Sequence, residues 1–287
     1  GLTALYTVLG GLAAVVVTET IQAIVLIIGA MVITWFAYEK VGGWDGMVNG
    51  LTASNDLLKL SMLRSPEVEK EFPWYAIFLG YPVLGIWYWC ADQTIVQRVL
   101  GAKDENHART GPLFCALIKV LPVFIFVLPG LLFYVIIKQN MLPGVTVPNS
   151  KEVYGIMIKS LLPAGLFGVM AAALMAALMG NLASAANSIS TLFSYDLWKR
   201  FSPQTPEDRL VYIGRVATFI SFVAGIALVP LLDRYESIFA GINDVIAHIA
   251  PPITCVFLLG IFWPKASAQS AKWTMWLGSA LGAALFT

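Results

Sequence analysis

The chain has 287 residues, 58% of them hydrophobic and 12% charged, with a net charge of +1 at neutral pH. Soluble domains carry about 25% charged residues, so this composition predicts a multi-pass membrane protein. The balanced charge gives no reason to expect a nucleic-acid partner. Cys90, Cys115 and Cys255 lie in apolar segments without paired spacing, which predicts small core side chains rather than a disulfide or a metal site.

Long apolar segments separated by polar residues predict membrane spans, each close to the ~20 residues that cross a bilayer core. We place seven of them near residues 11–38, 74–99, 112–138, 162–195, 208–232, 237–263 and 269–287. The polar stretches 39–72 and 139–160 are too short to form a second domain. We therefore expect residues 1–287 to form a single, partial transmembrane domain with an all-α fold.

Basic residues gather after the second, fourth and sixth predicted spans, at 98–109, 199–209 and 265–272. The positive-inside rule places these three loops in the cytoplasm. We therefore expect an integral, multi-pass protein of the plasma (inner) membrane, with the lipid bilayer as a partner.

The first span carries an acid, Glu19, inside an apolar helix. An ionised side chain at membrane depth is costly unless it faces water or a partner. Glu19 could lie near the inner interface and pair with a basic loop residue. It could instead face an aqueous pathway, where it would attract a cation or pass a proton.

The second span contains Pro82 and Gly85, followed by a run from Trp87 to Arg98 that holds three aromatic rings, Asp92 and two glutamines. Pro82 removes a backbone donor and Gly85 weakens the helix, so we predict a broken helix whose free backbone groups can meet a solute. The rings could stack on a sugar and donate from their polar tips. An interfacial aromatic belt would explain one or two rings, but not the polar residues that follow.

Polar groups also occur in the third and fourth spans. Lys119 could extend its stem toward the cytoplasmic headgroups or face a cavity. The fourth span has a nearly continuous face of small residues, which favours close helix packing. A polar stripe on the same helix could supply interhelical hydrogen bonds or an oxygen-rich wall for a monovalent cation; its members are Asn181, Ser184, Ser188 and Thr191.

The sixth span holds three polar residues before a Pro-Pro pair. Asn243 and Asp244 lie near its outer end, where water can solvate them, and His248 fits a satisfied core histidine. Nothing in the sequence has the spacing of metal ligands, a nucleophile with its base, or a phosphate loop. We therefore expect no enzymatic activity.

These residues together resemble the solute:sodium symporter family and, within it, the sodium/glucose cotransporter branch. The resemblance extends over almost the whole chain and is carried by runs at 6–16, 18–22, 87–98, 119–122, 127–130, 187–193, 196–199, 251–252 and 256–263. It implies the LeuT-type inverted-repeat fold, in which two five-helix bundles are related by a pseudo-two-fold axis. The chain would then hold the last helix of repeat one, five helices of repeat two and part of one peripheral helix.

The resemblance also implies roles for individual residues. The expected solute-binding positions are Gly85, Tyr88, Trp89, Lys119 and Asn243, and the expected gates are Tyr88 on the inner side and Phe239 on the outer side. The expected sodium positions are Ala177, Gly180 and Asn181, with Glu19 on the cation pathway. Gly180 and Asn181 stand where the sugar cotransporters carry two adjacent serines, and Asn243 is one methylene shorter than their usual glutamine.

The function that follows is secondary active import of a sugar or polyol, coupled to sodium by alternating access. Sodium would be the coupling ion, and no other cofactor is expected. Two alternatives stay open: a transporter-like membrane sensor, and a carrier of another small solute with weak, absent or proton coupling. The sequence gives no indication of the oligomeric state.

Overall fold

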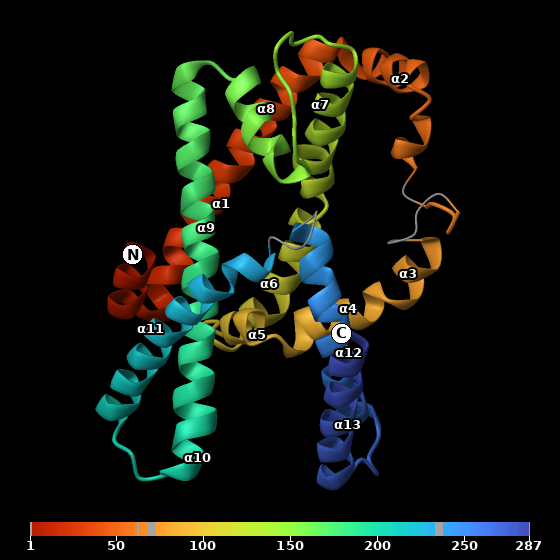
Figure 1. Ribbon diagram of the computed structural model, residues 1–287. Coiled ribbons are helices and arrows are strands. Elements are labelled where there is room, and N and C mark those ends of the chain that lie inside the picture. The colour runs from red at the N-terminus through yellow and green to blue at the C-terminus, as the bar shows by residue number, and fades with distance from the viewer. Residues whose placement is uncertain (1, 62, 68–72, 233–237, 287) are drawn as a thin grey trace. The chain divides into compact units, whose positions relative to one another are not determined.

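The computed structural model describes residues 2–61, 63–67, 73–232 and 238–286, and within these ranges it contains helices and no strands (Figure 1). The expectation of an all-α fold is confirmed. The long helices are α1 (Leu2–Val41), α6 (Glu105–Ile118), α7 (Leu128–Lys138), α9 (Ala164–Thr191), α11 (Glu207–Leu232), α12 (Ile238–Phe262) and α13 (Ala268–Phe286). The other helices are α2 (Gly43–Ala53), η1 (Leu57–Leu60), α3 (Trp74–Leu79), α4 (Tyr81–Ile86), η2 (Trp87–Ala91), α5 (Gln93–Leu100), η3 (Val123–Val127), η4 (Ser150–Glu152), α8 (Val153–Leu161), η5 (Leu192–Trp198) and α10 (Lys199–Phe201).

Five helical segments are long and apolar enough to cross a membrane, counting only the described residues. They are Val15–Val41, Glu105–Lys138, Ala164–Phe201, Glu207–Pro230 and Gly241–Phe262, and each overlaps one of the seven expected spans. The expected span at 74–99 is divided into α3, α4, η2 and α5, and the one at 269–287 forms α13; neither belongs to the five.

The two polar stretches between spans are not simple loops. Residues 39–72 contain α2 and η1, and residues 139–160 contain η4 and most of α8. Gly42 and Gly43 have φ angles of 86° and 78°, the left-handed conformation in which glycine carries no Cβ penalty. These two glycines end α1 and let α2 start in a new direction.

The residues gather into two compact units, residues 1–59 with 105–231 and residues 60–104 with 232–287. In the first unit, α1 packs along α9 and also against α7. The buried face of α9 consists mainly of small side chains, including Ala173, Gly180, Ala183 and Ala186. This face lets α9 approach α1 closely, as the small-residue pattern predicted.

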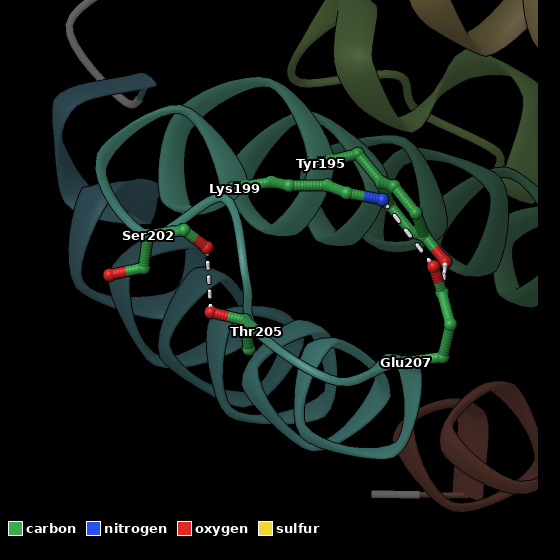
Figure 2. Close-up of polar contacts among 5 residues, drawn as sticks. All are labelled: Tyr195, Lys199, Ser202, Thr205 and Glu207. Atoms are coloured by element: carbon green, nitrogen blue, oxygen red, sulfur yellow. Dashed lines mark hydrogen bonds and ion pairs between the residues drawn. The ribbon is translucent and has the colours of Figure 1, made fainter.

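A polar clasp closes the turn between α9 and α11 in the first unit (Figure 2). The hydroxyl of Tyr195 donates to Glu207 Oε2 at 2.6 Å, and Lys199 Nζ lies 3.4 Å from Glu207 Oε1. In the turn itself, Thr205 Oγ1 donates to the carbonyl of Ser202 at 2.8 Å. The ion pair between Lys199 and Glu207 is largely exposed, so it adds little stability.

In the second unit, α12 packs against α13, α4 and η2. Thr254 Oγ1 on α12 donates to the carbonyl of Val83 on α4 at 3.1 Å. A Cβ on Gly282 of α13 would collide with the backbone carbonyl of His248 on α12. The glycine therefore permits the close approach of α12 and α13.

The expectation that the three cysteines are core side chains is wrong. Cys90, Cys115 and Cys255 are free and exposed. They lie on η2, α6 and α12, on helix faces that no neighbouring helix covers within the described residues. An apolar segment has apolar residues all round, so its composition does not reveal which face is packed.

Candidate functional site

The clearest polar contact between distant helices is at the crossing of α1 and α9. Ser184 on α9 is 1% exposed, and its hydroxyl donates to Glu19 Oε1 on α1 at 2.7 Å. Glu19 itself is half-buried. The carboxylate therefore faces the packed helix α9.

Gly180 lies one turn before Ser184 and faces the same part of α1. A Cβ built on it would lie 2.6 Å from Gln22 Oε1 and 2.9 Å from Glu19 Cγ. The Gln22 oxygen is buried and, within the described parts of the chain, accepts no hydrogen bond. Sequence reasoning missed Gln22; its i, i+3 spacing from Glu19, which puts both side chains on one helix face, was the signal available.

The other two expected sodium positions are placed differently. Ala177 is half-buried on α9, whereas the side chain of Asn181 is exposed. Consecutive residues of a helix point about 100° apart, so Asn181 turns away when Gly180 faces α1. Its carboxamide is therefore not directed at Glu19 in this arrangement.

The polar stripe on α9 serves two different purposes. Ser188 Oγ donates to the carbonyl of Ser184 at 2.9 Å, and Thr191 Oγ1 donates to the carbonyl of Asn187 at 3.0 Å, both within α9. Ser184 instead reaches across to α1. The hydroxyl of Ser184 thus joins two helices, while those of Ser188 and Thr191 donate to carbonyls of α9.

The second expected span breaks later than Pro82 and Gly85 suggested. The chain is interrupted weakly at Gly80, remains helical through Gly85 and then widens into the π-turn η2, where the N–H of Asp92 bonds to the carbonyl of Trp87 at 2.9 Å. Asp92 is extended, with ψ of 122°, and its carboxylate accepts from the N–H of Thr94 at 2.8 Å. Asp92 is therefore the N-cap of α5, which gives this acid a structural role.

The aromatic residues of η2 form a compact group in the second unit. The rings of Tyr88 and Trp89 are 5.5 Å apart at 89°, an edge-to-face pair, and Tyr88 is 36% exposed. Gly85, one turn earlier on α4, has open space where a side chain would be. This arrangement leaves an aromatic face with room beside it.

The expected outer residues lie on the first turns of α12, also in the second unit. The amide Nδ2 of Asn243 donates to the carbonyl of Phe239 at 2.8 Å, and Phe239 is 60% exposed. Asn243 keeps its carbonyl oxygen Oδ1 as a group that can accept from a solute hydroxyl. Since α12 packs against α4 and η2, one unit holds these residues and the aromatic group.

Lys119 belongs to the first unit. It follows the last residue of α6, and its N–H bonds to the carbonyl of Cys115 at 2.9 Å. Pro122 has no N–H to offer the carbonyl of Ile118, which explains why α6 stops here. The side chain of Lys119 is exposed. Its convergence with Trp89 and Asn243 stays a prediction, because those residues belong to the other unit.

The chain matches the model of the Sodium:solute symporter family over residues 1–278. The chain belongs to the sodium:solute symporter family. Among similar members of the family, the sodium/mannose cotransporter of Bos taurus is 36% identical, with 98% of this chain and 51% of the relative aligned. The sodium/glucose cotransporter 4 of Danio rerio is 35% identical (98% and 46%), and the sodium/myo-inositol cotransporter 2 of Oryctolagus cuniculus is 34% identical (98% and 45%).

The chain spans about half the length of these sodium:solute symporters. A solved structure of a Na⁺-coupled sialic acid symporter, in a substrate-bound outward-open state, superimposes with a TM-score of 0.76 at 24% identity, over 99% of this chain and 63% of that one. The similarity confirms the expected LeuT-type transporter fold. With the five apolar helical segments, family membership identifies an integral, multi-pass membrane protein.

Proposed function

We propose that the protein is a secondary active transporter that imports a sugar or polyol together with sodium by alternating access. The observation that carries this proposal is the similarity, at 34–36% identity, to three cotransporters named for sodium and for mannose, glucose or myo-inositol. Sodium is then the coupling ion and the sugar or polyol the transported partner. The expected location is the plasma (inner) membrane, and residues 1–287 would act as one transmembrane domain.

The aromatic group of the second unit supports a sugar or polyol as the solute. Tyr88 and Trp89 present perpendicular rings, and a sugar ring can pack its apolar face on such a surface. Gly85 leaves room beside them, and Asn243 offers a carbonyl oxygen to hydroxyl groups. Lys119 would add a charged donor, as the resemblance to the family implies.

The transport cycle would then proceed by differential binding to two conformations. A cation shifts the equilibrium between inward-open and outward-open states only as far as its affinities for the two states differ. We assign the gates to Tyr88 on the inner side and Phe239 on the outer side. Their exposure, 36% and 60%, fits side chains that close over a solute rather than core residues.

Glu19 supports coupling to a cation. Its carboxylate is held at a helix crossing by Ser184, and a half-buried carboxylate attracts a positive ion or a proton. Of the expected sodium positions, Gly180 lies against this carboxylate, Ala177 would contribute a backbone carbonyl, and Asn181 would have to turn inward to contribute its amide.

Uptake by the full-length protein in proteoliposomes tests the proposal. Radiolabelled mannose, glucose and myo-inositol are offered with an inward sodium gradient and with potassium replacing sodium on both sides. The proposal predicts accumulation of at least one solute in sodium alone. Uptake driven equally well by a proton gradient would favour the proton-coupled carrier, and binding without uptake would favour the sensor.

A further inference from the structure

The strongest unexplained feature of the first unit is the side-chain oxygen of Gln22. It is buried between α1 and α9, and no described residue donates a hydrogen bond to it. Buried acceptors in folded proteins are almost always satisfied, because an unpaired one loses its hydration without replacement. This oxygen therefore indicates a ligand that supplies positive charge or a donor.

The neighbours of this oxygen are themselves oxygen atoms. Glu19 lies one turn earlier on the same face of α1, and Ser184 is fixed to Glu19 Oε1 at 2.7 Å. Ser184 donates its hydroxyl hydrogen in that bond, and a hydroxyl oxygen can also accept or coordinate through its lone pairs. Carboxylate, carboxamide and hydroxyl oxygens from two helices thus converge, the donor set that hard cations prefer.

Gly180 makes this convergence possible. A Cβ at this position would lie 2.6 Å from Gln22 Oε1, 2.9 Å from Glu19 Cγ and 3.4 Å from Glu19 Oε1. Any side chain at 180 would have to displace the amide of Gln22, the stem of Glu19 or both. Because Gly180 has no side chain, the side chains of Gln22 and Glu19 can occupy the volume beside it.

We propose that Gln22 is a ligand of the transported sodium ion, together with Glu19 and Ser184, and that Gly180 is the positioning residue that leaves space for it. In this chain the amide oxygen of Gln22 on α1 then supplies the contact that a side chain at position 180 of α9 could otherwise make. The inference rests on the proposed sodium coupling and adds to it a specific residue and a reason for the glycine.

The test is equilibrium binding of ²²Na⁺ to the purified full-length protein, with no solute present. Gln22→Leu removes the oxygen at similar volume and should weaken sodium binding at least tenfold, while Gln22→Glu keeps an oxygen and should retain binding. Gln139→Leu is the control for the same chemical change at the end of α7. Gly180→Ala should also weaken binding, whereas Gly165→Ala, on the same helix with open space around it, should not.

Sodium binding by the wild-type protein distinguishes a failure of the proposed sodium coupling from a failure of the proposed role of Gln22. Wild-type protein that binds no ²²Na⁺ contradicts sodium coupling itself and the inference with it. Wild-type protein that binds sodium, together with a Gln22→Leu variant of unchanged affinity, overturns only the role of Gln22. Equal affinities for Gly180→Ala and Gly165→Ala would overturn the role of Gly180. Thermal unfolding of each variant shows that it is folded.

Discussion

The hydroxyl of Ser184 donates a 2.7 Å hydrogen bond to the carboxylate of Glu19, 165 positions earlier in the chain. This bond connects α1 with α9. Among the residues described, Glu19 on α1 is the expected residue of the cation pathway, and α9 carries the expected sodium positions. It gives the acid inside an apolar helix a defined partner. The consequences for stability and for coupling can be tested separately.

Ser184→Ala should lower stability and weaken sodium dependence. The variant removes the donor and leaves the half-buried carboxylate with one partner fewer, a loss of about 1 kcal/mol for hydrogen bonds between membrane helices. Thermal unfolding and the sodium concentration for half-maximal uptake measure the two effects. Ser188→Ala is the matched control, because the hydrogen bond described for Ser188 goes to the carbonyl of Ser184 within α9. Equal effects of both variants would contradict the interhelical role.

Two substitutions of Asp92 test whether this residue caps α5 or takes part in transport. Asp92→Ala should destabilise the start of α5 by about 1 kcal/mol, since the side chain accepts from the N–H of Thr94. Asp92→Asn should retain both stability and uptake, because asparagine is an equally good cap. Thermal unfolding and solute uptake are measured for both variants. If Asp92→Asn stops uptake while unfolding at the wild-type temperature, the charge itself takes part in transport.

The loop after α2 should respond to acid. Tyr134 donates to Asp56 Oδ2 at 2.6 Å, and Lys59 lies 3.3 Å from Asp56 Oδ1; the bond from Tyr134, with help from Lys59, lowers the pKa of Asp56. A depressed folded-state pKa contributes stability above the unfolded value of about 3.9, and this contribution is lost as the pH falls through the folded-state pKa. The difference in unfolding temperature between wild type and Tyr134→Phe should therefore be larger at pH 6 than at pH 3. A difference that does not change with pH would contradict this assignment.

Lys119→Ala should raise the KM for the solute by about tenfold, the effect of losing a hydrogen bond of about 1.4 kcal/mol. Insertion should survive, because the membrane loses a costly charge. Uptake kinetics at saturating sodium measure the change, and Lys103→Ala in the neighbouring loop is the control. An unchanged KM would assign Lys119 to the headgroup region.

The sequence predicted the features that depend on composition and on one helix at a time. The small face of α9 was evident from the spacing of Ala173, Gly180 and Ala183, and it is the buried face. The apolar runs overlap the five described segments that are long and apolar enough to cross a membrane. Such features follow from helix periodicity, which is fixed by backbone geometry.

Features that depend on tertiary contacts were harder to predict. Pro82 suggested a break, but the main break is at Asp92, because a π-turn depends on how the preceding helix packs and not on one proline. The sequence around Gln22 does not show that its side-chain oxygen lies next to Gly180 of α9. The pairing of Glu19 with Ser184 needed the crossing of α1 and α9, which no local pattern specifies.

The most direct test of sodium-coupled solute import measures the entry of ²²Na⁺ and of the transported sugar or polyol into the same proteoliposomes. For the full-length wild-type protein we expect the solute to stimulate sodium entry at a fixed ratio, and we expect Glu19→Ala to abolish that ratio. Sodium entry that stays the same whether or not the solute is present would contradict the account.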